Sequence, residues 1–336
     1  MSVFDYLSDD GQVLVLLCSG FALPTDAATT GLAPFKLSEW NQLARRIHES
    51  ALSRPSALLG LKPEDLATAL TVPAEDAERI VRLLERAPRA ALELENLFGR
   101  GLWVVTRADT NYPARLRATL KHQAPAVLFG AGEISLLRQS GVAIVGSRDV
   151  DEAGTRFAQE VARQAVAAGR PVVSGGARGT DRIAMQAALD AGGIAFGALA
   201  DSLDRTVRQP DLRELLQDRR LVLVTPFLPT AGFSIGTAMG RNKIIYGLSE
   251  YAVIASSDHA TGGTWAGAEE ALKGKWCPLY VRAGENVPKG NRELIKLGAT
   301  GLEPETLAEI KDLPAWFEAH RPQVPVEMDL FASAKA

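Results

Sequence analysis

The architecture is indicated by Val142-Ala143-Ile144-Val145-Gly146-Ser147-Arg148. Four apolar residues, enough for a buried strand, end in a glycine and precede a helical pattern with Phe157, Val161 and Ala165 on one face. The alternation continues downstream, and further strands are expected at residues 172–173, 194–199, 221–224, 251–255 and 278–281. Such alternation predicts an α/β fold with a Rossmann-like, doubly wound, mostly parallel sheet.

Upstream of this region, the sequence changes from helical to strand character near residue 99. Helix starts are expected at Ser38, Pro63 and Pro73, and strands at residues 102–106 and 126–130. We therefore expect a small all-α, SAM-like module at residues 1–98 and a Rossmann-like domain at residues 99–301. A C-terminal helix at residues 306–320 and a flexible tail complete the last region, residues 302–336. The helical module is either a structural cap or a contact surface for nucleic acid or protein.

Composition excludes several classes of protein. No stretch approaches the roughly 18 apolar residues of a membrane span, and residues 12–17 lack the flanks of a signal peptide, so we expect a cytoplasmic protein without membrane contact. Cys18 and Cys277 are too few for a disulfide framework or a thiolate metal site. Because the net charge is −3, a nucleic-acid partner would have to bind a local basic surface.

Four glycine-containing segments are expected at the carboxyl ends of strands, where open parallel sheets bind ligands. They are Gly146-Ser147-Arg148, Ser174-Gly175-Gly176-Ala177-Arg178-Gly179-Thr180-Asp181, Gly240-Arg241-Asn242-Lys243 and Thr261-Gly262-Gly263-Thr264. Glycines let the backbone approach a ligand, helix N-termini offer unpaired N–H groups, and arginine adds a fork for phosphate. The segments therefore predict an anion site. The third, which we expect to begin a helix, has two cations and an amide that suit a nucleic-acid backbone.

Some of these residues allow another interpretation. Asp181 is either the cap of the next helix or the group that orients Arg178. Arg241 and Lys243 are either available at the entrance of a site or part of a solvated charged turn. P-loop, zinc-protease, Cys-pair and serine-hydrolase motifs do not occur, so we expect no metal, no cofactor and no catalytic residue.

The order of these motifs resembles the DprA/Smf DNA-processing family. The resemblance extends from residue 60 to residue 301 and includes Asp109-Thr110-Asn111-Tyr112-Pro113 and Gly290-Asn291-Arg292-Glu293-Leu294-Ile295. It implies a homodimer that binds single-stranded DNA without strong sequence preference. It also implies assistance in loading a RecA-type recombinase during transformation and recombination. Carried over to this chain, the strand-binding positions are Arg148 and Lys243, with Arg178 and Arg241 as neighbours.

The sequence departs from the family pattern at several places. Gly176 and Thr180 replace a leucine and an isoleucine, and Met185 stands where the family usually has a histidine. The residues after Gly301 are too few for the complete winged helix that ends many members. These departures indicate a divergent relative. Of the properties that the resemblance implies, recombinase loading is the one that it supports least.

The fourth segment supports an alternative function. Gly262-Gly263-Thr264, with Glu269 and Glu270 downstream, is similar to the glycine loop of LOG-type nucleotide phosphoribohydrolases, in which a glutamate acts on the ribosyl bond. The alternative is a nucleotide-binding or nucleotide-cleaving enzyme that uses one of these glutamates. A purely structural or adaptor role is the third possibility.

The tail contains one further motif. Glu327-Met328-Asp329-Leu330-Phe331 resembles the pentapeptide with which many bacterial proteins bind the replication sliding clamp, although Glu327 stands at the usual glutamine. Leu330 and Phe331 either fold back on the protein's own surface or bind this clamp.

Overall fold

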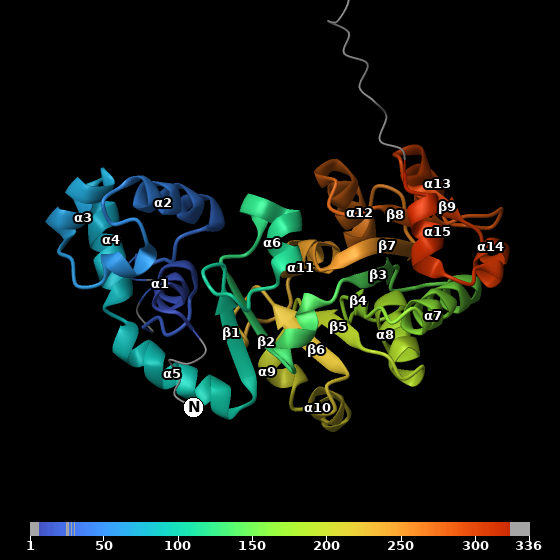
Figure 1. The fold of residues 1–336 in the computed structure, drawn as a ribbon, viewed down its shortest axis with the longest axis horizontal. Coiled ribbons are helices and arrows are strands. Elements are labelled where there is room, and N and C mark those ends of the chain that lie inside the picture. Colours follow the sequence, from blue (N-terminus) through green and yellow to red (C-terminus); the bar gives the residue numbers. More distant parts are fainter. Residues whose placement is uncertain (1–6, 25–26, 28, 30, 323–336) are drawn as a thin grey trace, which may run out of the picture.

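The computed structural model describes residues 7–24, 27, 29 and 31–322. Within them, nine strands form one sheet in the order β1-β2-β6-β5-β4-β3-β7-β8-β9 (Figure 1). The strands are β1 Leu102–Thr106, β2 Val127–Ala131, β3 Gly141–Gly146, β4 Val172–Ser174, β5 Ala195–Ala198, β6 Leu221–Thr225, β7 Ser249–Ser256, β8 Leu279–Arg282 and β9 Thr300–Leu302. The pairs β1–β2 and β2–β6 are antiparallel, and all other neighbouring strands are parallel. The predicted Rossmann-like, mostly parallel sheet is confirmed.

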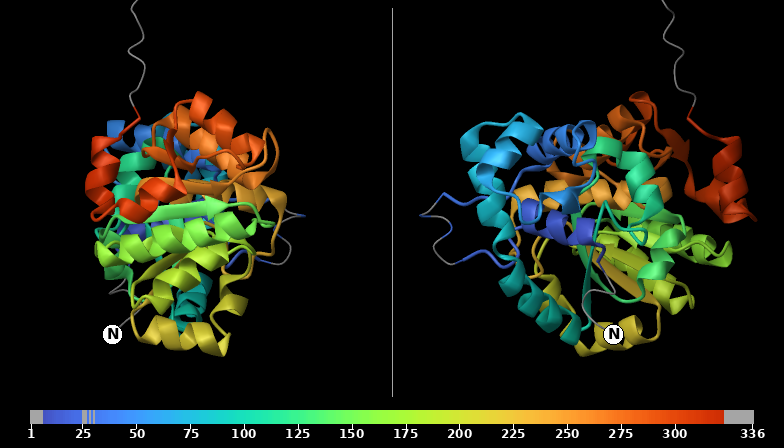
Figure 2. Two further views of the ribbon diagram at one scale, coloured as in Figure 1. Left: turned by 90° about the vertical axis from the view of Figure 1, so that its right-hand side faces the viewer. Right: turned by 60° about the vertical axis from the view of Figure 1, so that its left-hand side comes forward.

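Helices cover both faces of the sheet, which explains the uninterrupted apolar runs of its strands. In β3, Val142 and Ile144 point into the apolar cluster under one helix layer, and Ala143 and Val145 point into the cluster under the other. The first layer contains α7 Glu152–Ala167 and α8 Thr180–Asp190, and the second contains α6 Ala114–Leu120, α11 Ile235–Gly247, α12 Gly262–Gly274 and α13 Lys289–Lys296. Figure 2 shows the sheet between the green helices α7 and α8 and the orange helices α12 and α13.

The strand order creates a crevice near the middle of the sheet. From β3 to β6 the chain builds outward in one direction, and it then returns to place β7 on the other side of β3. The loops after β3 and β7 diverge from this switch point, which is where such sheets bind ligands. The two loops begin side by side, because the Ser147 backbone N–H donates to the Ser256 carbonyl oxygen at 2.8 Å.

The helical module lies beside the β1 edge of the sheet (Figure 1). Its helices are α1 Asp9–Cys18, α2 Leu37–Glu49, α3 Pro63–Leu70, α4 Ala74–Leu84 and α5 Ala87–Gly99. The three predicted helix starts are present, whereas α1 lies at residues for which no helix was predicted. The module shares its core with the sheet, because one buried apolar cluster contains Leu14 and Leu17 of α1 together with Leu102, Val104 and Phe129.

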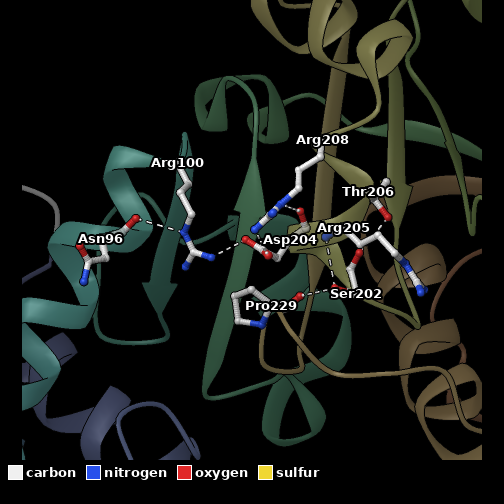
Figure 3. Close-up of polar contacts among 8 residues, drawn as sticks. All are labelled: Asn96, Arg100, Ser202, Asp204, Arg205, Thr206, Arg208 and Pro229. Atoms are coloured by element: carbon white, nitrogen blue, oxygen red, sulfur yellow. Dashed lines mark hydrogen bonds and ion pairs between the residues drawn. The ribbon is translucent and has the colours of Figure 1, made fainter.

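Arginine side chains connect the parts of this half of the molecule. The buried Arg86 side chain donates to the carbonyl oxygens of Leu16, Phe21 and Leu83. Arg100, which follows α5, donates to the Asp204 carboxylate in α9 (Leu203–Thr206). Arg208 donates to the same carboxylate at 2.7 Å, so two arginines converge on one acid between the module and the sheet domain (Figure 3).

The C-terminal region differs from the single predicted helix. It forms α14 Pro304–Glu309 and α15 Leu313–Ala319, because Pro314 cannot donate a backbone N–H and Asp312 caps a new start by accepting from the Ala315 N–H at 3.0 Å. Phe317 of α15 packs on the rings of Tyr251 and Tyr280, with centroids 4.8 and 4.3 Å away.

Two further predictions concern membrane-spanning helices and the C-terminal motif. The helices among the described residues all fall short of the length and apolar character needed to cross a bilayer. The sliding-clamp motif, residues 327–331, lies outside the described residues.

A stability measurement can test the role assigned to Arg86. We expect Arg86→Ala to lower the free energy of unfolding by about 3 kcal/mol, since three buried carbonyl groups lose a charged donor. The matched control is Arg89→Ala, which removes an exposed ion pair to Glu93 and should change stability by about 0.5 kcal/mol or less. Urea denaturation followed by circular dichroism measures both variants. Equal losses would contradict the anchoring role.

Candidate nucleic-acid interface

The first glycine segment lies at the carboxyl end of β3, inside the crevice. We expected it to enter a helix directly, but α7 begins only at Glu152. Asp151 caps this helix by accepting from the Gly154 N–H at 2.6 Å, and it pairs with Arg282 at 3.0 Å. A carboxylate of the protein thus occupies the α7 N-terminus. The group available to a ligand here is therefore the exposed Arg148 side chain rather than the end of a helix.

The glycines of the first two segments allow their loops to pack closely. A Cβ atom on Gly146 would lie 2.5 Å from Thr180 Oγ1, and one on Gly179, whose φ is 84°, would overlap the Arg148 carbonyl. The Thr180 backbone N–H and hydroxyl both donate to the Ser147 carbonyl oxygen, at 3.2 and 3.1 Å. These contacts hold the loop that carries Arg148 against the start of α8.

The third segment is not the start of a helix, as we had predicted, but part of its interior. Helix α11 begins at Ile235, after Ser234, whose hydroxyl accepts from the Thr237 N–H at 3.0 Å. The Thr237 hydroxyl accepts in return from the Ser234 N–H at 2.8 Å. This reciprocal cap is the sequence signal that we overlooked. Residues 240–243 consequently lie one to two turns inside the helix.

Arg241 is buried, with 5% of its surface exposed, and is not available at the entrance of the site as predicted. Its Nη1 atom lies 3.7 Å from Asp181 Oδ2, and a Cβ atom on Gly175 would overlap that nitrogen. The Asp181 side chain therefore faces Arg241, and α8 has no side-chain cap. The ion pair of Arg178 is instead with the exposed Asp149, at 2.8 Å.

Burial dominates the electrostatics of this ion pair. It raises the pKa of the Asp181 carboxyl, and the Arg241 charge opposes that rise only in part. Burial likewise lowers the pKa of the Arg241 guanidinium, with Asp181 as the main opposing group. Among the described residues, Arg241 Nε and Nη1 have no hydrogen-bond partner. Each charge therefore depends on the other, since loss of one would leave a buried ion uncompensated.

An exposed apolar surface lies next to Arg148. Its guanidinium carbon is 5.4 Å from the centre of the Phe233 ring, and 54% of Phe233 is exposed. Ile235 and Met239 are 80% and 38% exposed. None of the three was predicted as a site residue. Helical spacing could have indicated Ile235 and Met239, since it places them one turn apart and opposite the core residue Ile244.

Lys243 lies one turn beyond Met239 along α11 and contacts other elements. Its Nζ atom is 2.7 Å from Glu270 Oε1 of α12 and 3.1 Å from Gln123 Oε1, and it lies 5.8 Å from the centre of the Trp276 ring. The neighbouring Asn242 donates to the Gly263 carbonyl oxygen at 3.0 Å. Arg241 and Lys243 thus lie at different depths on α11 and have different partners, so the two do not form one basic pocket.

The fourth segment forms the start of α12. Thr261 makes no side-chain cap, and Gly262 and Gly263 are exposed, so this helix N-terminus remains open. Glu269 and Glu270, the residues of the enzymatic alternative, lie two turns further along the helix. They pair with Lys273 at 2.8 Å and with Lys243 at 2.7 Å.

The described residues contain no group of three or more histidine, cysteine or acidic side chains placed to hold a metal ion. The two cysteines are far from nucleophilic, because burial raises the pKa of Cys18 strongly and that of Cys277 to about 12.

A double-mutant cycle can test the dependence between Arg241 and Asp181. We expect Asp181→Leu alone to destabilise the protein by about 3–5 kcal/mol, because it leaves a buried guanidinium unpaired. Addition of Arg241→Met should recover part of this loss, since the double variant buries no charge. Chemical denaturation of the four proteins gives the coupling energy. Additive losses would show that the two groups do not stabilise each other.

Comparisons with known proteins agree with the motif resemblance. Residues 103–312 match the family model described as DNA recombination-mediator protein A. Protein Smf of Escherichia coli is 29% identical over 205 residues, which are 59% of this chain and 54% of that protein. A putative DNA processing protein DprA of Mycobacterium tuberculosis H37Rv is 30% identical over 198 residues, 54% of this chain and 50% of that protein. The chain thus spans about half the length of these relatives.

Solved structures show the same fold. DprA from Streptococcus pneumoniae matches with a TM-score of 0.60 and 23% identity, over 82% of this chain and 99% of that one. DprA from Helicobacter pylori, studied for its single-stranded DNA binding mode, matches with a TM-score of 0.50 and 25% identity, over 60% of this chain and 90% of that one. Because the family model covers more than half of the sequence, this chain belongs to the DNA recombination-mediator protein A family, known as DprA or Smf.

Proposed function

We propose that this chain binds single-stranded DNA, without strong sequence preference, at the crevice beyond β3 and β7. The observation that carries the proposal is the exposed pair of Arg148 and Phe233 at this edge. A guanidinium binds phosphate, and an aromatic ring stacks on any base, so the pair fits a strand of any sequence. The likeness to the Helicobacter pylori protein, whose reported ligand is single-stranded DNA, supports this proposal.

The geometry favours a single strand over a duplex. Phe233 and Ile235 present apolar surface on which unstacked bases can pack, whereas a duplex presents its phosphates and keeps its bases stacked. Arg148 and Arg178 would contact the phosphates from the rim of the crevice. Arg241 is buried, and its role in this proposal is to hold α11, which begins just after Phe233, in position.

We further propose a role in DNA processing that involves no chemical step. As a homodimer in the cytoplasm, the protein would present single-stranded DNA to a RecA-type recombinase during DNA uptake and recombination. The family membership supports this role. In this proposal Glu269 and Glu270, which pair with Lys273 and Lys243, take no part in a chemical step, and release of free base from nucleoside monophosphates would contradict it.

Fluorescence anisotropy with labelled oligonucleotides tests the binding proposal. Arg148→Ala should weaken binding to single strands of all sequences and lower the slope of log affinity against log salt by about 0.7, for one phosphate contact. Phe233→Ala should weaken binding about tenfold with an unchanged salt slope, because stacking carries no charge. Binding of the wild-type protein to duplex should be weaker.

The controls are Arg89→Ala and Leu92→Ala, which remove an exposed cation and an exposed apolar side chain from α5. Both should bind single strands as the wild type does. If the Arg148 and Phe233 variants also bind like the wild type, the strand lies elsewhere on the molecule.

A further inference from the structure

A second concave surface lies between the helical module and the sheet domain. This cleft has a volume of about 640 Å³ and is lined on one side by residues of α1, α2 and the connection between them. On the other side it is lined by η3 (Lys121–Gln123), β2, α11 and the loop between β6 and α11. Its size and its mixture of apolar walls with few polar groups are typical of sites for small organic groups.

Each side of the cleft carries an aromatic side chain that contacts other parts of the protein. Phe35 on the module side donates its backbone N–H to the Leu17 carbonyl oxygen at 2.7 Å, and the Arg79 guanidinium covers its ring at 4.0 Å. Phe227 on the opposite side is half-buried and packs closely on Gly240, since a Cβ atom there would lie 3.1 Å from the ring. Aromatic walls fixed in this way suit a flat, apolar ligand.

Helix α11 connects the cleft to the proposed DNA crevice. Ile235, Met239 and Lys243 follow one another at one-turn spacing on a single face of this helix. Ile235 lies at the end next to Phe233, whereas Gly240 and Lys243 line the cleft. The distance from Ile235 to Lys243 along the helix axis is about 12 Å. A strand bound at Phe233 could therefore follow this face and reach the cleft within a few nucleotides.

The polar groups of the cleft are largely occupied by bonds within the protein. The Asn41 amide donates to the His122 carbonyl oxygen at 2.8 Å, and its oxygen accepts from Arg107 at 2.8 Å. The Gln123 side-chain oxygen accepts from Lys243 at 3.1 Å. Few groups remain to read the edge of a base, so a ligand would be held by its faces rather than by its hydrogen-bonding pattern.

We propose that this cleft is a base-binding site, in which the helical module and the sheet domain together enclose an unstacked base of the bound strand. The inference rests on the proposed binding of single-stranded DNA. It gives the helical module a direct part in that binding and provides a second stacking site that accepts any base.

The test fills the cleft without removing a charge. Ala231 lines the cleft, whereas its neighbour Thr230 is exposed outside it, so Ala231→Phe and Thr230→Phe form a matched pair. Anisotropy measures the affinity of each protein for oligo-dT and for an abasic oligonucleotide of the same length. Ala231→Phe should weaken oligo-dT binding about tenfold and leave abasic binding unchanged, and Thr230→Phe should bind both as the wild type does.

A second measurement uses the wild-type protein and does not depend on the folding of a variant. Oligo-dT with photoreactive 4-thiothymine is crosslinked, and the modified peptides are mapped by mass spectrometry. Crosslinks at residues 226–231 or 121–123, the segments that line the cleft, support the base-binding site. Crosslinks confined to residues 146–148 and 233–239, at the crevice, overturn it. If Ala231→Phe leaves the affinity for oligo-dT unchanged, the base-binding site is overturned, but the proposed function is not. If the wild-type protein does not bind single strands at all, both proposals are overturned.

Discussion

The Arg241 guanidinium, enclosed beside Asp181 and packed on the backbone of Gly175, connects α11 to the carboxyl end of β4 and the start of α8. Helix α11 begins at the carboxyl end of the sheet and runs back along one of its faces, and both proposed contact regions depend on its position. A side chain at residue 175 would occupy the space of the guanidinium, and a neutral residue at 181 would leave the charge unpaired. Three positions far apart in the sequence are therefore linked by one buried charge.

The first turn and the middle of α11 have different surroundings, and both parts contribute to the proposed interface. At its start, Phe233 and Ile235 are exposed beside Arg148, at the crevice that the strand order creates. Further along, Gly240 and Lys243 face the cleft under the helical module. A DNA strand that followed this helix would first contact Arg148 and the apolar surface around Phe233, and would then reach the cleft. Such an order fits a ligand with a charged backbone and flat, variable bases.

The sheet was largely predictable because its strands are buried on both faces. Strands of this kind are continuous apolar runs, and β1 to β8 lie where such runs occur. Strand β9, Thr300–Leu302, contains a single buried apolar residue, Leu302, and therefore has no apolar run to recognise. The position of Arg148 also followed from the sequence, since loops after central strands meet at the crevice.

The interior of the site was not predictable in the same way. Gly240 resembles a turn signal, and this local cue concealed a helix that begins at Ile235, after its cap Ser234. Whether Arg241 is exposed depends on Gly175 and Asp181, which only the folded chain brings close to it. The exposure of Phe233 is equally a property of the tertiary structure, because an isolated aromatic residue in a sequence more often indicates core.

Hydrogen–deuterium exchange with and without a saturating oligonucleotide tests the central claim most directly, because it locates the bound strand on the intact protein. With single-stranded oligo-dT, the account predicts slower exchange in peptides that contain residues 146–151 and 233–243, and no change in peptides from α7 and α15 on the opposite helix layer. A duplex of equal length at the same concentration should produce a smaller effect. Protection confined to α7 or α15, with residues 146–151 and 233–243 unchanged, would contradict the account.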